Sequence, residues 1–524
     1  MKRALLVVLV AVFAVGCAKC GKSPVAKATP VERVIPRGAV AAVMVPSVGT
    51  FGQKLKIVEA LKVSGFVAQL QGFNDGKVFG DALVAELGID VRSADALAKA
   101  GIDGSRGAAF AVLATSHMYL ALPVNDEARF HEAFAALVLR RLGAAVEGEL
   151  KAGELSVKTF SARAGEPARA GYVVAKGYAL ITDASGIGQL AGLASLTDSD
   201  ALSGDRDYVL RLREMPSERD VVAWVPLGSP ALFRGPVSAA IGAATLTTSG
   251  LAVVVDASWK DDGTRFAALN AEKGDDNLGY LPRDAFLVTR FNGDPAKLHP
   301  WVKQLFGPYL ARAFDQGSFD VKSEVLEQLK PGAVVSLSLS EKPPMGSGMP
   351  ALDLRQTNPF SFAHLSGVAQ VKSPDAIVPT FEKIIAVAPK FGAQMELRTR
   401  DDGQKAILTT YSAGEGVHFA PKGDRVFFAS PVQRLDALVK SDGKAGAPVA
   451  GLTDDAVSLV IDLRKLATSV RELPDSAWGL GGFAMKATTV RWLDATNDLK
   501  SIAVSASVKE KVVRVNARLD LGAP

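Results

Sequence analysis

Residues 35–45 read IPRGAVAAVMV, and residues 281–291 read LPRDAFLVTRF. Each stretch begins with a large aliphatic residue, Pro and Arg, has Ala at its fifth position, and continues as a largely apolar run. Such a run after a Pro-containing turn is typical of a β-strand. The two stretches lie 246 residues apart. This spacing indicates an internal duplication, in which each copy begins with this strand.

Further matches follow in the same order along both halves of the chain. The remaining pairs are RGAAFAVLA (from 106) with PGAVVSLSL (from 331), the segments ending at Phe134 and Phe381, TFSA (159–162) with TYSA (410–413), the segments from Gly171 and Gly416, and those from Leu251 and Ile502. We therefore predict two repeats, over residues 31–276 and 277–524.

Within each repeat, short apolar or alternating segments predict strands, and longer periodic segments predict helices. The strands expected in the first repeat are 39–45, 108–114, 172–182 and 221–226. Residues 126–142 predict a helix, because apolar residues recur at helical spacing between an acidic start and Arg140-Arg141. Lys176-Gly177 and Lys422-Gly423 fit hairpin turns. The predicted fold class is α+β, with two similar tandem domains, each a mostly antiparallel sheet partly covered by helices.

The composition is that of a globular chain. Hydrophobic residues make up 48% of the 524 residues and charged residues 22%, with a net charge of +5. A charge this small and dispersed is not typical of a nucleic-acid-binding protein, so we expect no nucleic-acid partner.

The first residues predict a targeting segment. Lys2 and Arg3 precede an apolar run from Ala4 to Val15, and Gly16-Cys17 follows. The run is too short to span a bilayer as a helix, which favours a signal peptide over residues 1–16. An ordinary secretory signal cut elsewhere is the alternative.

The end of this run, with Ala14 where Leu is commonest, resembles the lipobox of bacterial lipoproteins. That resemblance implies acylation of Cys17 by diacylglyceryl and a further chain such as palmitate, giving a membrane anchor. Residues 17–30 would be the acylated Cys and a flexible tether. Ala18 follows the Cys instead of Asp, which is similar to lipoproteins of the outer membrane facing the periplasm. Cys20 is then an isolated thiol, so a Cys-x-x-Cys redox or metal pair is not expected.

The Ile/Leu-Pro-x-x-Ala pattern with its strand, turn and helix resembles a family of uncharacterised bacterial envelope proteins that share a domain of unknown function. The resemblance implies the fold and the compartment. It supplies no catalytic residue.

Several short patterns that could carry chemistry differ between the two copies. Gly186 to Ala191 fits a dinucleotide fingerprint, but its counterpart begins Ser430-Pro431, which favours a turn capped by Ser185 or Ser430. His131-Glu132 begins a zinc-protease motif whose second His is replaced by Ala135. We therefore predict no catalytic residue, no metal and no cofactor.

Two apolar segments need separate interpretation. Residues 235–255 carry no charge, yet their Thr, Gly and Pro content favours a buried helix followed by a strand over a membrane span. An insertion at 341–362 interrupts the second repeat and offers apolar side chains for contacts: Met345, Met349, Phe360 and Phe362. It is either a partner-binding loop or a plain surface loop.

The sequence alone favours a membrane-anchored envelope lipoprotein with a non-catalytic binding or structural role, in contact with an envelope protein, a glycan or a lipid. The alternatives are a carrier of lipid or another apolar ligand, and a hydrolase whose site is assembled from distant residues.

Overall fold

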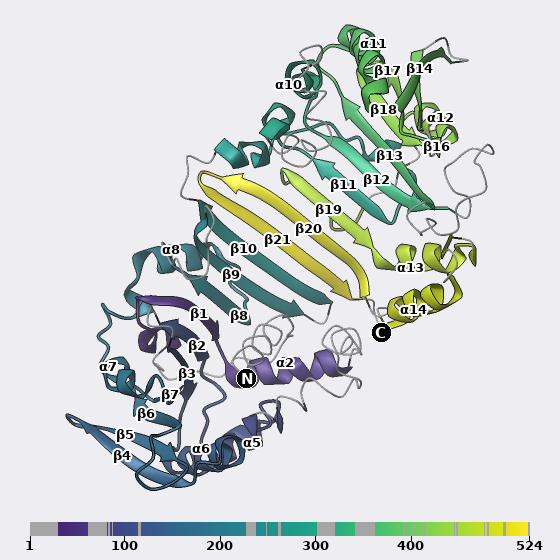
Figure 1. Cartoon of the computed structure of the whole chain (residues 1–524). Helices are drawn as coiled ribbons and strands as arrows, with labels where there is room; N and C mark the ends of the chain where they lie inside the picture. Colours follow the sequence, from purple (N-terminus) through teal and green to yellow (C-terminus); the bar gives the residue numbers. More distant parts are fainter. Residues whose placement is uncertain are drawn as a thin grey trace. The chain divides into compact units, whose positions relative to one another are not determined.

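The computed structural model describes residues 30–60, 81, 84–85, 87–113, 117–226, 237–247, 249–259, 264–300, 320–340, 362–391, 393–400, 403, 405–411, 414–444, 446, 449–475, 477–478, 482–495 and 499–521 (Figure 1). Cys17, Cys20, Met345, Met349 and Phe360 lie outside the described residues.

The chain divides into two compact units. Unit 1 comprises Met1–Asp261 with Leu521–Pro524, and unit 2 comprises Asp262–Asp520. The division between units falls at 261/262, whereas the sequence pattern places it at 276/277.

Unit 1 contains a ten-stranded antiparallel arrangement. Its strands are β1 (Ala39–Val45), β2 (Ala108–Leu113), β3 (Met118–Pro123), β4 (Val146–Ala152), β5 (Leu155–Ser161), β6 (Ala170–Ala175), β7 (Tyr178–Asp183), β8 (Val221–Val225), β9 (Val237–Thr247) and β10 (Gly250–Trp259). Their pairings give the order β4-β5-β6-β7-β3-β2-β1-β8-β9-β10. The strand expected at 172–182 is the hairpin β6–β7, and Lys176 and Gly177 both have positive φ at its turn.

Side chains alternate between the two faces of this sheet and form two cores. Tyr172 packs on one face with Phe130 and Phe134, while its neighbour Val173 packs on the other with Leu190. The helices of unit 1 are α2 (Val48–Ala60), α5 (Ala94–Lys99), α6 (Glu127–Leu142), α7 (Leu190–Ala194) and α8 (Arg206–Glu214). Residues of α2, α5 and α6 belong to the first core and those of α7 and α8 to the second, so helices cover both faces.

Helix α6 confirms the helix predicted from the periodicity of 126–142. Asp126 is its N-cap and accepts from the backbone N–H of Arg129 at 3.1 Å. Gly143 ends the helix in the left-handed conformation, at φ 61°.

Unit 2 is built in the same way. Its strands are β11 (Leu287–Phe291), β12 (Ala333–Leu339), β13 (Ala363–Gln370), β14 (Ala393–Thr399), β15 (Lys405–Tyr411), β16 (Gly414–Glu415), β17 (His418–Lys422), β18 (Arg425–Ser430), β19 (Val457–Asp462), β20 (Leu499–Lys509) and β21 (Val512–Leu521). Its helices are α10 (Val321–Glu324), α11 (Ile377–Val387), α12 (Val432–Lys440), α13 (Leu463–Glu472) and α14 (Gly482–Ala495). The antiparallel pairings run β14-β15-β17-β18-β13-β12-β11-β19-β20.

The order of strand pairing is therefore the same in both units up to the last hairpin. β1 lies between β2 and β8, and β11 lies between β12 and β19. In this order β20 takes the place of β9, so the sequence match of Leu251 in β10 with Ile502 in β20 is displaced by one strand. The fold class is α+β with a mostly antiparallel sheet, as predicted.

The uncharged segment 235–255 was wrongly expected to contain a helix. Its described residues form the hairpin β9–β10, in which Gly250 pairs with Thr247 and the strands run antiparallel to Trp259. Small and β-branched side chains fit a strand with close neighbours on both sides, and this packing outweighs the high helix propensity of Ala. No helix among the described residues is both long and apolar enough to cross a membrane.

Phe362 does not act as a surface contact. It is 1% exposed and packs in a small core with Val470, Leu473 and Trp478. Its inclusion among the partner-binding side chains is therefore corrected: Phe362 is a core residue of unit 2.

Candidate functional site

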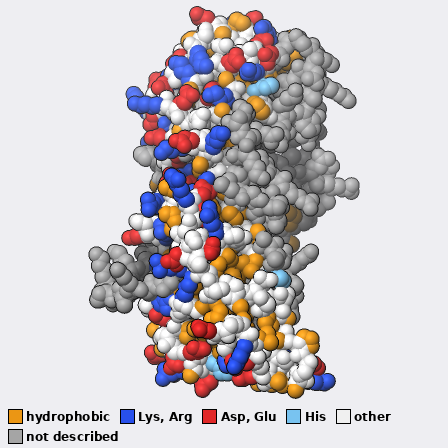
Figure 2. Space-filling model, turned by 90° about the vertical axis from the view of Figure 1, so that its left-hand side faces the viewer, with side chains coloured by type: hydrophobic (Ala, Val, Ile, Leu, Met, Phe, Trp, Pro, Cys, Tyr) orange, Lys and Arg blue, Asp and Glu red, His pale blue; other side chains and the backbone are white. Residues whose placement is uncertain are grey.

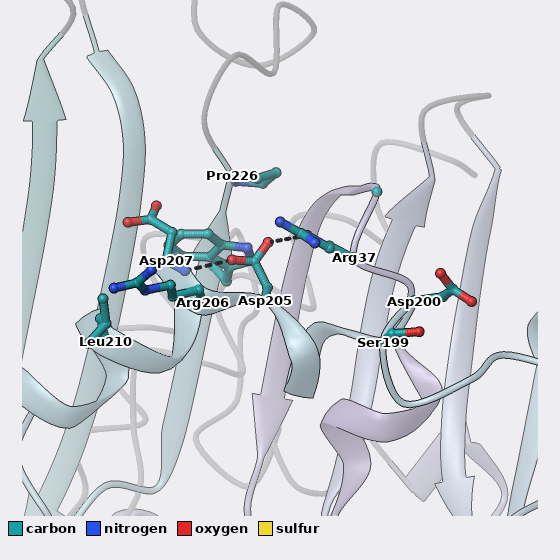
Figure 3. Close-up of a pocket in the computed structure, with 10 residues that line it drawn as sticks. Arg37, Ser199, Asp200, Asp205, Arg206, Asp207, Leu210 and Pro226 are labelled. Atoms are coloured by element: carbon teal, nitrogen blue, oxygen red, sulfur yellow. Dashed lines mark hydrogen bonds and ion pairs between the residues drawn. The ribbon is translucent and has the colours of Figure 1, made fainter.

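A cavity of about 840 Å³ opens in unit 1 where the Pro36-Arg37 segment leads into β1. Ten residues line it: Arg37, Gly38, Ser199, Asp200, Asp205, Arg206, Asp207, Leu210, Trp224 and Pro226 (Figure 3). They come from three parts of the chain: the turn before β1, residues 199–210 at and before the start of α8, and the end of β8.

An ion pair connects two walls of this cavity. The Nε atom of Arg37 lies 3.3 Å from Oδ2 of Asp205, and the two side chains point toward each other in Figure 3. Asp205 is also the N-cap of α8, where its Oδ1 accepts from the backbone N–H groups of Asp207 (2.9 Å) and Tyr208 (3.1 Å). The carboxylate therefore fixes the start of α8 against the turn before β1.

Two buried polar atoms of the cavity residues have no partner among the described residues. They are Nε1 of Trp224, whose side chain is 1% exposed, and Oδ2 of Asp207. The other carboxylate oxygen of Asp207 accepts from Nε of Arg211 at 2.9 Å. Buried donors and acceptors in proteins are almost always hydrogen-bonded, so an indole N–H and a carboxylate oxygen left without partners require an explanation. Neither atom is open to solvent, so a ligand group that both donates and accepts would reach them only after the side chains that cover them move.

Unit 2 has a second cavity at the corresponding place. It measures about 190 Å³ and is lined by Leu281, Pro282, Arg283, Ala285, Phe286, Val288, Val449, Ala450, Val460, Asp462, Lys465, Lys500 and Ser501. The correspondence follows from the strand register, since Trp224 pairs with Ala42 of β1 and Val460 pairs with Val288 of β11. The linings differ, with two Arg and three Asp in unit 1 but Arg283, two Lys and one Asp in unit 2.

His131, the first residue of the incomplete zinc motif, lies in a hydrogen-bonded chain instead. Its Nδ1 is 2.9 Å from the Tyr172 hydroxyl, and its Nε2 is 3.1 Å from Oε2 of Glu147. Because a carboxylate only accepts, neutral His131 carries its proton on Nε2 and accepts from Tyr172 at Nδ1. Burial raises the pKa of Tyr172 to about 12, and the charges of Glu127 and Glu147 add to this rise. This tyrosine therefore stays protonated, which suits a structural hydrogen bond.

The possible dinucleotide loop is excluded by topology. β7, which precedes it, pairs antiparallel with both β3 and β6, whereas the fingerprint requires a parallel β-α-β unit. A Cβ on Gly186 would lie 2.1 Å from Oγ1 of Thr182, so this glycine is needed for close packing.

The predicted serine caps are also incorrect. The N-caps of the helical segments after β7 and β18 are Gly186 and Pro431, and neither forms a side-chain cap hydrogen bond. Ser185 instead donates to Asp183.

Metal-ligating residues do not cluster in the part of the chain that the structure describes, where no group of three His, Cys, Asp or Glu could hold an ion. Among the buried histidines, His418 is 2% exposed and its Nδ1 accepts from the backbone N–H of Thr409 at 3.0 Å.

The surface shown in Figure 2 has cationic and anionic side chains interspersed, with small groups of hydrophobic side chains between them. On this face, the described side chains form no large patch of one charge sign.

Sequence reasoning did not identify Asp205, Asp207 and Trp224. The available signal was Arg37 and Arg283, which occupy the same position in the two copies of the opening motif and line the two cavities.

No protein-family model and no curated protein matches the chain. Among solved structures, crystal forms III, I and IV of TP0453 are similar, with identities of 11%, 10% and 10% and TM-scores of 0.25, 0.24 and 0.24. The similar regions cover 45%, 45% and 44% of this chain and 81% of TP0453 in each case. At these TM-scores the likeness supports no conclusion about function.

Proposed function

We propose that this protein is a lipoprotein of the cell envelope, anchored through acylated Cys17 on the periplasmic side of the outer membrane, and that it binds a glycan without catalysis. The two units are, in this proposal, copies of one duplicated α+β domain. The unit 1 cavity is the glycan site.

The observation that carries the proposal is the pair of unpartnered buried atoms on two residues that line that cavity, which a ligand would reach once the side chains that cover them move. Nε1 of Trp224 can donate and Oδ2 of Asp207 can accept. A sugar hydroxyl can both donate and accept, so sugar hydroxyls have the chemistry to satisfy both atoms. Satisfying buried polar groups is a main source of selectivity in such sites.

The charges of the cavity favour an uncharged ligand. Arg37 is paired with Asp205 and Asp207 is paired with Arg211, so four of the charged side chains at or beside the cavity already neutralise one another. Leu210, 50% exposed, adds an apolar surface at the cavity for the C–H face of a sugar ring.

Calorimetric titration of the purified mature chain with oligomers of N-acetylglucosamine tests the site. We expect saturable binding that Asp207→Asn weakens about tenfold or more, because an amide nitrogen would replace an acceptor with a donor; tenfold corresponds to about 1.4 kcal/mol. Trp224→Phe, which keeps a ring and removes the N–H, should weaken binding similarly.

Asp95→Asn is the matched control, since Asp95 also lies in the first turn of a helix, α5, but outside the cavity. Equal binding by the Asp207 and Asp95 variants, or no saturable binding, would reject the glycan site.

The anchor is tested separately by Cys17→Ser. Loss of acyl labelling and a shift out of the membrane fraction are expected. Unchanged fractionation would reject the anchor and leave the cavity proposal standing.

A further inference from the structure

The second cavity, in unit 2, has an apolar interior. Its inner wall is formed by side chains that are 3–9% exposed: Leu281, Ala285, Phe286, Val288 and Val460. A volume of about 190 Å³ is roughly six times the share of one water molecule in the liquid, which is room for a short apolar segment and not for a whole acyl chain.

Cationic side chains also line this cavity. Arg283, Lys465 and Lys500 are exposed, and Asp462 is the one acid that lines the cavity among the described residues. Asp462 is occupied as the N-cap of α13, accepting from the backbone N–H of Lys465 at 2.9 Å. The lining therefore has an excess of positive charge.

The ammonium of Lys465 is held in place by carbonyl groups. Its Nζ donates to the carbonyl oxygen of Arg283 at 2.7 Å and lies 3.4 Å from that of Ala285. Neither Lys465 nor Lys500 forms an ion pair with a carboxylate among the residues that the structure describes. Carbonyl groups orient a charge but do not neutralise it, so both ammonium groups can still bind an anion.

The fold does not require this charge. At the corresponding cavity of unit 1, the lining has more Asp than Arg, and the strand register around it is the same. The cationic lining is thus a property of unit 2 alone, and it is combined there with an apolar interior.

We propose that the unit 2 cavity binds a single-chain anionic amphiphile: the carboxylate or phosphate head contacts Lys465 and Lys500, and the first methylene groups enter the apolar interior. The glycan site of unit 1 plays no part in this proposal.

Titration of the purified mature chain with octyl phosphate and with octanoate tests the proposal and separates the two head groups. At least one of them should bind saturably. Octanol, which lacks the charge, and inorganic phosphate, which lacks the chain, should each bind at least tenfold more weakly. Shortening the chain should weaken binding by roughly fourfold for each methylene removed from the cavity.

Lys500→Met and Lys465→Met remove the charge and keep an apolar stem of similar length. Each should weaken binding about tenfold. Lys509→Met is the matched control, because Lys509 lies on the same strand, β20, outside the cavity, and it should change affinity less than twofold.

Because Lys465 also bonds to backbone carbonyls, Lys500→Met is the decisive variant; no hydrogen bond of its ammonium within the described residues would be lost. Equal affinity for octyl phosphate and inorganic phosphate, unchanged affinity in Lys500→Met, or no binding of either amphiphile would overturn the proposal. Asp207→Asn should leave amphiphile binding unchanged, so failure here is distinct from failure of the glycan site.

Discussion

Nε of Arg37 lies 3.3 Å from Oδ2 of Asp205, and this contact joins the motif that opens the first strand to the helix beside the unit 1 cavity. The side chain of Arg37 is 59% exposed, whereas that of Asp205 is 13% exposed. An exposed ion pair adds little stability, so we expect the N-cap to be the larger contribution of Asp205.

Asp205→Ala should lower the free energy of unfolding of unit 1 by about 1–2 kcal/mol, because the first turn of α8 loses its cap. Asp205→Asn should cost less, since an amide oxygen can still cap the helix. Urea unfolding of both variants measures the difference. An equal loss in the two variants would mean that the charge of Asp205, and not its cap hydrogen bonds, stabilises unit 1.

Phe362→Ala should destabilise unit 2 by about 3–5 kcal/mol, because it leaves a cavity in a buried cluster. Trp478 lies in the same cluster, so its fluorescence follows the local unfolding directly. Met485→Ala, at a side chain that is 54% exposed, is the control and should change stability by less than about 0.5 kcal/mol. If the Phe362→Ala variant had the same urea midpoint of unfolding as the wild type, that result would contradict the place of Phe362 in the core.

Gly186→Ala should destabilise unit 1 by about 1–3 kcal/mol, because the added methyl group overlaps Thr182. A methyl group on Gly188 would meet no atom within 4 Å, so Gly188→Ala should be nearly neutral. Thermal unfolding distinguishes the two. If both substitutions lowered the thermal stability equally, close packing against Thr182 would not explain why residue 186 is a glycine.

Unit 1 should lose stability at high pH. The pKa of Tyr172 is raised to about 12 and those of Tyr119 and Tyr208 are raised by burial, so the folded state retains protons that the unfolded state releases near pH 10. The stabilisation from Tyr172 is complete below about pH 10 and is lost as the pH rises through about 12.

Urea unfolding at pH 8 and pH 11 measures this loss. Tyr172→Phe should show a smaller decrease between the two pH values than the wild type, because one of the shifted groups is gone. A decrease of the same size would show that Tyr172 titrates normally.

The parts of the fold that follow from local patterns could be predicted. Strand β1 was predicted from its apolar run after a Pro-containing turn, and helix α6 from the helical spacing of its apolar residues and its acidic start. Strand β9 was missed because its Ala-rich sequence fits a helix equally well, and only its neighbours β8 and β10 decide between the two.

The unit 1 cavity could not be predicted, because its walls come from segments that are distant in sequence. Arg37, Asp205 and Trp224 lie in three separate parts of the chain, and the pairing of β1 with β8 brings the first and last of these parts together. Burial of Phe362 has a similar cause, since its partners Val470, Leu473 and Trp478 come about a hundred residues later in the chain.

A crystal structure of the mature chain with an N-acetylglucosamine oligomer tests the central claim most directly. We predict a sugar in the unit 1 cavity, with hydroxyl groups at hydrogen-bond distance from Nε1 of Trp224 and Oδ2 of Asp207. A sugar bound elsewhere, or a cavity in which other protein groups satisfy these two atoms, would contradict the account.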